Sequence, residues 1–253
     1  MSGVLLPGTA QAPQVLSGYT ASGAGGVGFA GSALPGPTAP YAGIWAFTPL
    51  VSGSVTPSTT TPINLPPGEP DTAIVVVAAG GSGSTTFSLS DSFATHYTWA
   101  LVASSPSGGN YGCAIFLGTR SGAASTDLVG TVTINNSASA SSNAIAVPLL
   151  GAQGVLAGAG NGNGSSSASG TSLPMGSVSP TMTTVLVGVL LAGSNYISAP
   201  TSPSGMVVIP ISSSSGEGFV IIVPNLAAGT YNPTPVTNAT TTVNWSSAIA
   251  VFD

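Results

Sequence analysis

The sequence predicts an all-β protein: an antiparallel β-sandwich or jelly roll with an extended N-terminal arm rich in Gly and Pro. Short apolar runs enriched in Val, Ile and Thr recur along the chain, which is typical of strands. Clusters of Gly, Pro, Ser and Asn separate these runs, as turns would. No segment repeats its apolar residues with the helical period, and the good helix formers Lys, Glu and Gln are nearly absent.

Residues 1–60 form the predicted arm. Proline removes backbone donors and glycine raises the cost of ordering, so regular helices and long strands are disfavoured there. A flexible linker would not need aromatic side chains, so the arm is expected to pack on its own body or on a neighbouring subunit. A partly disordered tail is the alternative. The aromatic residues expected to make these contacts are Tyr19, Phe29, Tyr41, Trp45 and Phe47.

The β-sandwich is expected over residues 61–253, with antiparallel strands joined by short turns. The predicted strands are Ile63–Leu65, Asp71–Ala79, Thr85–Leu89, Tyr97–Ala103, Tyr111–Leu117, Asp127–Asn135, Asn143–Leu150, Thr184–Ala192, Met206–Ile211, Gly218–Val223 and Thr240–Phe252. The uncharged segment GAQGVLAGAGNGNGSSSASGTS, residues 151–172, is expected to be a long surface loop. Two small domains, divided at this segment, are the alternative to a single sandwich.

Charge is almost missing from the chain. The 253 residues include no lysine, one arginine, one histidine and six acids, and charged residues make up 3%, against about 25% in an ordinary soluble domain. Nucleic acid is not an expected partner, because phosphate affinity comes from Lys and Arg. No apolar run approaches the roughly 20 residues of a membrane-spanning helix. The composition therefore predicts a protein that is not an enzyme and binds no cofactor.

The few chemistry-bearing residues have structural interpretations. Asp91 and His96 would need an exposed serine nucleophile to form a triad, and no G-x-S-x-G motif is present. We expect Asp91 to cap a turn and His96 to lie at the start of a strand. Arg120 is expected in a turn, paired with an acid such as Asp127. Glu69 and Asp71 are the only close acidic pair in the sequence. The main expectation is that no metal binds, and these two residues are the weak candidates for a metal site.

The sequence also predicts roles for Cys113, the tryptophans and four asparagines. Cys113 lies in an apolar run and is predicted to be a buried, unreactive thiol rather than an intermolecular disulfide. Core packing is expected for the tryptophans, with a carbohydrate-binding face as the alternative; they are Trp45, Trp99 and Trp245. Four N-x-[ST] sequons mark possible glycosylation sites, of which the one in the predicted loop is the best placed. They are Asn135, Asn163, Asn238 and Asn244.

A resemblance to a family rests on a series of phrases in roughly residues 60–253: DTAIVVVAAGG, SLSDSFATHYTWALV, YGCAIFLG, GTVTIN, AIAVPLLGAQG, GFVIIVPNLAAGTYNPT and TTTVNWSSAIAVF. This pattern of strands and turns resembles a β-sandwich module of uncharacterised phage and bacterial surface proteins. The resemblance implies display on a virion or cell surface and contains no catalytic motif. Residues 1–60 have no counterpart in it.

A nearly neutral surface suggests that the chain is permanently assembled, because soluble proteins use net charge partly to stay apart. Biased residue usage in the source organism is the alternative reason for the missing charge. No export signal is recognised in the N-terminal residues, which favours a virion over a cell appendage. The sequence thus predicts a structural subunit of a virion surface (capsid, decoration or tail-associated), in symmetric homo-oligomers and in contact with other virion subunits. The alternatives are an extracellular filament subunit that donates a strand to its neighbour and a carbohydrate- or receptor-binding module.

Overall fold

The computed structural model of the chain describes residues 20–22, 28–30, 43–44, 48–53, 58–81, 85–106, 111–137, 142–150, 156–166, 170–193, 197–213, 216–238 and 242–253. All regular secondary structure in these residues is β-strand, and every pairing is antiparallel. The predicted all-β, sandwich-like fold is confirmed. In the part of the chain described, no helix is long and apolar enough to cross a membrane.

The chain divides into two compact units, Met1–Pro40 and Tyr41–Asp253. The first contains one described hairpin, β1 (Thr20–Ser22) paired with β2 (Gly28–Ala30). The predicted arm of residues 1–60 crosses the boundary between the units, because later parts of it pair with strands of the second unit. The side chains of its five aromatic residues lie outside what the structure describes, although the backbone of Phe29 lies in β2.

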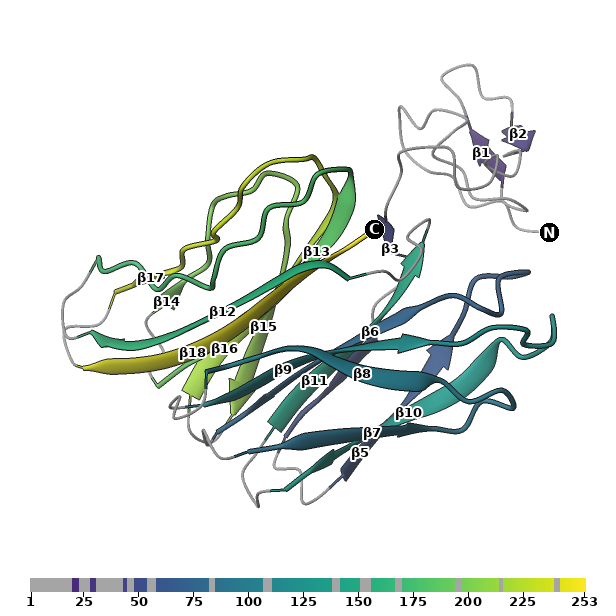
Figure 1. Ribbon diagram of the computed structural model, residues 1–253, viewed down its shortest axis with the longest axis horizontal. Coiled ribbons are helices and arrows are strands. Elements are labelled where there is room, and N and C mark those ends of the chain that lie inside the picture. Colours follow the sequence, from purple (N-terminus) through teal and green to yellow (C-terminus); the bar gives the residue numbers. More distant parts are fainter. Residues whose placement is uncertain are drawn as a thin grey trace. The chain divides into compact units, whose positions relative to one another are not determined.

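Three sheets build most of the second unit (Figure 1). The outer sheet has the order β5-β10-β7: β5 (Ser58–Asn64), β10 (Val129–Asn136) and β7 (Phe87–Asp91). The middle sheet has the order β3-β11-β6-β9-β8: β3 (Gly43–Ile44), β11 (Ser142–Leu150), β6 (Ile74–Gly80), β9 (Gly112–Thr119) and β8 (Thr98–Ser104). β4 (Thr48–Gly53) also pairs with β11.

The C-terminal sheet has the order β12-β18-β13-β16-β15: β12 (Leu156–Ser166), β18 (Val243–Phe252), β13 (Thr184–Ala192), β16 (Gly216–Leu226) and β15 (Val207–Ser213). A two-stranded ladder joins β14 (Ile197–Ser198) to β17 (Val236–Thr237). Strands before residue 151 build the outer and middle sheets, and later strands build the C-terminal sheet. The middle and C-terminal sheets pack on each other and share one core.

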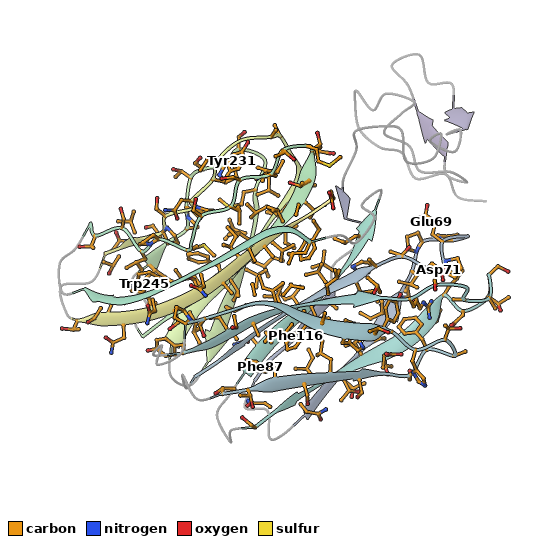
Figure 2. The ribbon with its side chains drawn as sticks, in the orientation of Figure 1. Glu69, Asp71, Phe87, Phe116, Tyr231 and Trp245 are labelled. Atoms are coloured by element: carbon orange, nitrogen blue, oxygen red, sulfur yellow. The ribbon has the colours of Figure 1, made fainter. Side chains whose placement is uncertain are left out.

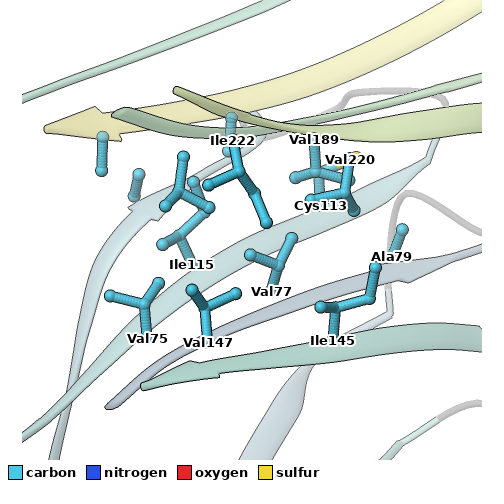
Figure 3. Packing of buried hydrophobic residues seen from close by; sticks show 14 of the residues in the cluster. Val75, Val77, Ala79, Cys113, Ile115, Ile145, Val147, Val189, Val220 and Ile222 are labelled. Atoms are coloured by element: carbon cyan, nitrogen blue, oxygen red, sulfur yellow. The ribbon is translucent and has the colours of Figure 1, made fainter. Parts of the chain in front are cut away.

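The middle sheet is buried on both faces, and alternate residues of one strand enter two different cores. Val75 and Val77 of β6 pack with Val189 of β13 in the core between the middle and C-terminal sheets (Figure 3). Ile74 and Val76 point to the opposite face, where they meet the outer sheet. Successive side chains of a strand point to opposite faces, so a strand covered on both sides must be apolar throughout. This accounts for the uninterrupted run IVVVAA in an antiparallel sheet.

The C-terminal sheet is also covered on its second face, by irregular chain rather than by a sheet. Leu173 and Met175 pack there against Leu186, Leu190 and the neighbouring strands. Their segment is held by a backbone ladder to residues 231–237, in which Leu173 N donates to Pro235 O at 2.8 Å and Met175 N to Pro233 O at 3.0 Å. Both central sheets are therefore enclosed, which gives the run TVLVGVLLA of β13 the same explanation as that of β6.

The predicted loop at residues 151–172 is wrong in its central part, where β12 pairs with β18. The segment 174–177 lies directly on two of the alternate glycines of β12, and the Trp245 ring lies against Gly162 and Gly164. A Cβ on Gly160 would come within 2.9 Å of Ser177 O, and one on Gly162 would collide with Pro174 O. Glycine inside a strand often marks such a close backbone approach. The low-complexity composition therefore reflects packing, and its two-residue period is the strand signal that the prediction missed.

Candidate functional site

Most of the Asp, Glu, His and Arg side chains of this sparsely charged protein lie in three neighbouring loops, residues 65–73, 92–97 and 120–128, with Asp91 at the end of β7. We name this group the charged loop cluster: Asp71, Asp91, His96, Arg120 and Asp127. Figure 2 shows Asp71 and the nearby Glu69 at one end of the sheets, far from Trp245. Because charged side chains are not gathered in this way elsewhere among the described residues, the cluster is the first candidate for a functional site.

Arg120 is the centre of the cluster, and its guanidinium is 1% exposed. Nε donates to Pro70 O at 2.7 Å, Nη1 donates to Thr95 O at 2.8 Å and to Asp127 Oδ2 at 2.9 Å, and Nη2 donates to the Asp127 carbonyl. The rings of Phe93 and Tyr97 each lie 4.6 Å from its central carbon. The planar fork of donors and the flanking rings are a geometry that arginine serves and lysine does not. One side chain thus fastens three loops together.

Asp127 is the ionic partner, with a side chain 6% exposed. Its carboxylate accepts hydrogen bonds from the backbone N–H groups of Thr95 at 2.8 Å and Ala94 at 3.2 Å, besides the bond from Arg120. The Thr95 N–H bond, opposed by burial and supported by Ala94 and Arg120, holds the pKa of this carboxyl below its ordinary value. The predicted Arg120–Asp127 pair is confirmed.

Asp91 caps the turn that follows β7, as the sequence predicts. Its carboxylate accepts from the backbone N–H groups of Phe93 at 3.2 Å and Tyr97 at 3.1 Å, and from Trp99 Nε1 at 3.1 Å. The His96 ring, 71% exposed, places Nδ1 at 3.0 Å from Asp91 Oδ1. His96 precedes β8, also as predicted. Among the described residues, no serine hydroxyl hydrogen-bonds to His96.

Asp71, one of the acidic pair that the sequence offers to a metal, binds backbone groups of another loop. Asp71 accepts hydrogen bonds from Gly122 N and Ala123 N, each at 2.9 Å, so that both its oxygens brace the loop that carries Arg120. Glu69 is exposed, and its backbone carbonyl accepts bonds from Thr72. Within the described ranges, no three His, Cys, Asp or Glu side chains are grouped as a metal site would require.

The described tryptophans are packing residues. Trp245 is 5% exposed and lies against Gly162 and Gly164 of β12, where a Cβ on either would crowd the indole. Trp99 is half-buried and lies over Gly118 of β9. Trp45 lies outside the described residues. The expected core packing is therefore observed for Trp245, and Trp99 pairs its ring with the backbone of a neighbouring strand.

Cys113 and the sequons complete the sequence-derived candidates. Cys113 is buried, its thiol donates to Ser246 O at 3.4 Å, and burial raises its pKa to about 12, which confirms the predicted buried thiol. All four sequon asparagines are exposed. Asn163 lies in β12 instead of the predicted loop, and Asn238 donates from Nδ2 to Ser198 Oγ at 2.7 Å.

Sequence reasoning missed the residues that complete the charged loop cluster. The carbonyl of Pro70, the carbonyl and N–H of Thr95 and the rings of Phe93 and Tyr97 come from loops distant in sequence from Arg120. Backbone acceptors and ring faces leave no pattern in composition or spacing. The cluster they form uses its carboxylates and its guanidinium on internal bonds, so its evident chemical effect is to hold the loops in place.

No protein-family model, curated protein or solved structure matches the chain.

Proposed function

We propose that this chain is a non-enzymatic structural subunit of a virion surface, as a capsid, decoration or tail-associated protein, and that it assembles into symmetric homo-oligomers. The observation that carries the proposal is the use of charge. The one arginine and three of the six acids are engaged in bonds inside a single group of loops. Apart from that group, the surface relies mainly on neutral Ser, Thr, Asn and Gly, which resist association weakly.

The enclosed sheets support a mechanical role. Two central sheets share one core, and each has a second apolar cluster on its other face. Apolar side chains as far apart in sequence as Val75 and Val187 are therefore locked into one packed body. Dense packing of this kind transmits load with little deformation. A subunit that must hold its shape within a larger assembly has use for such a body.

An extracellular filament subunit is the second candidate, favoured by a specific observation: β12 is a long edge strand to which a neighbour's strand could be added. A carbohydrate-binding module receives less support, because Trp245 is buried and the indole N–H of Trp99 donates to Asp91.

Electron microscopy of the natively produced material, with an antibody against this chain, tests the proposal. Regular labelling of icosahedral or tailed particles is the expected result. A continuous helical polymer of this chain alone would favour the filament candidate. Soluble monomers that are absent from every particle would contradict both assembly roles.

A further inference from the structure

The sheets expose edge strands, and an exposed edge offers backbone donors and acceptors to another chain. Natural proteins guard such edges with lysine, proline, bulges or short strands. This chain contains no lysine. Its edges must therefore be guarded in other ways or be used for pairing.

Most of the described edge strands carry a guard. Three of them contain a proline, which has no N–H to donate: Pro49 in β4, Pro62 in β5 and Pro210 in β15. The register of β8 shifts between Leu101 and Ala103, as in a bulge. β7 has 5 residues and ends in a charged one, Asp91.

Among the edge strands longer than two residues that the structure describes, β12 alone lacks these guards over most of its length. It has 11 residues, no proline and no charge. Its register with β18 shifts only at its start, between Leu156 and Gly158, and then stays regular to Ser166. Its position at the end of the C-terminal sheet is visible in Figure 1.

The face of β12 that is turned away from the segment 174–177 is exposed. Ala159, Asn161 and Asn163 are exposed there, and Asn161 Nδ2 also donates to Ser104 O of β8 at 2.9 Å. An open groove of about 270 Å³ lies beside them, between β12 and β8, and Leu101 on its wall is 56% exposed. A strand added to β12 would therefore lie next to exposed apolar surface and would help to cover it.

The residue order of β12 indicates which partner fits. Around Gly162 the sequence reads nearly the same in both directions: Asn161 and Asn163, then glycine on either side, then Ala159 and Ser165. In an antiparallel pair centred on Gly162, small residues would meet small residues and asparagine would meet asparagine on the same face. A two-fold interface brings the same surface of both subunits together, and this strand is complementary to itself.

We infer that β12 pairs antiparallel with β12 of a second copy of this chain, centred on Gly162, and joins two C-terminal sheets into one continuous sheet. The inference rests on the proposed assembly role, for which it names the contact and the partner. It distinguishes a closed two-fold pair from donation of a strand into the next subunit, which would continue into an open polymer.

Charge exchange on the full-length chain tests this pairing. In N161K/N163K, the introduced lysines face one another across the two-fold axis, and in N161D/N163D the aspartates do. Each variant alone should raise the dissociation constant of self-association by about 100-fold or more at low salt, and an equimolar mixture should restore it to within about 10-fold of the wild type. Sedimentation equilibrium gives the constants, and circular dichroism checks the fold.

The matched control is S88K/S90K, which adds two lysines at alternate exposed positions of another edge strand, β7. It should leave self-association unchanged. If N161K/N163K self-associates as tightly as this control, the β12 pairing is overturned while the assembly role stands. Failure of the mixture to recover also overturns the pairing, because the register about Gly162 is then not used. A wild-type chain that never self-associates contradicts both.

Discussion

Arg120 and Asp127 form an ion pair with an Nη1–Oδ2 distance of 2.9 Å, although their side chains are only 1% and 6% exposed. Burying two charges costs more than their attraction returns unless further hydrogen bonds satisfy them. Here the carbonyls of Pro70 and Thr95 and the N–H groups of Thr95 and Ala94 provide those bonds. A protein that avoids charge elsewhere thus uses its single arginine to fix the loops at one end of its sheets.

Loss of the Arg120 side chain should destabilise the fold. R120A should lower the free energy of unfolding by about 3–5 kcal/mol, because it leaves the buried Asp127 carboxylate without its opposite charge and removes the donor to three carbonyls. R120K should recover only part of the loss, since lysine lacks the planar fork that bonds Pro70 and Asp127 at once. Urea titration followed by fluorescence measures both. As a control, N135A on the exposed side of β10 should change stability by less than about 0.5 kcal/mol. An R120A effect that small would show that the ion pair does not hold the loops.

The lowered pKa of Asp127 predicts how stability responds to acid. Its carboxylate is more acidic in the folded chain than in the unfolded one, chiefly because of the Thr95 N–H bond. This contribution is therefore complete above the ordinary aspartate range, about pH 4, and is lost as the pH falls through the lower folded pKa. The urea midpoint should stay nearly flat from about pH 8 to pH 5 and fall below about pH 4.

D127N provides the comparison for this acid response. It should be less stable at neutral pH, because Arg120 loses its charged partner, and its midpoint should fall less steeply below about pH 4. Equal slopes for the two proteins in acid would assign the response to other carboxyl groups.

Most strands were predictable because they are apolar runs enriched in β-branched residues. The run Thr184–Ala192 coincides with β13, and Asn143–Leu150 falls short of β11 by one residue. β12 was not predicted, because glycine occupies its alternate positions. The usual apolar residues of a strand are therefore missing, even though the two-residue period is present. Periodicity also could not reveal that irregular chain around Leu173 and Met175 covers the C-terminal sheet, because that cover depends on contacts distant in sequence.

The candidate site was predictable only in its ionic pairs. The chain has one arginine, and Asp127 is an acid only seven residues from it in sequence. Asp91 is only five residues from His96, close enough for the two to meet across a turn. The stacking of Arg120 between Phe93 and Tyr97 requires the three loops to be in place first. Such a contact depends on the folded topology and cannot be read from spacing along the chain.

The buried thiol of Cys113 gives a prediction in base. Burial raises its pKa to about 12, against about 8.5 for a free cysteine. The folded state thus favours the neutral thiol, so its stabilising contribution is complete below about pH 8.5 and declines as the pH rises toward 12. C113A should remove this decline between about pH 8.5 and pH 10, where tyrosines still contribute little. A wild-type midpoint that is flat over this interval would contradict the buried, neutral state of the thiol.

The same burial predicts slow chemistry at Cys113. A thiol-specific reagent should react at neutral pH only after urea unfolds the chain, because the thiolate is the reacting form and the native thiol is covered. The rate should follow unfolding as urea is raised. Fast labelling of the folded protein would show that the sulfur is reachable.

The glycines of β12 give a prediction that separates packing from strand propensity. G162A places a methyl group against Pro174 O and within 2.8 Å of the Trp245 ring, so it should lower the free energy of unfolding by about 1–3 kcal/mol. G158A is the matched control on the same strand, where the nearest atom to the new Cβ is Val251 Cγ2 at 3.3 Å. Its effect should stay within about 0.5 kcal/mol, because alanine suits a strand at least as well as glycine. Urea unfolding of the two variants decides the matter: similar losses would mean that the covering segment does not press on Gly162, and that the glycine period of β12 serves some purpose other than close packing.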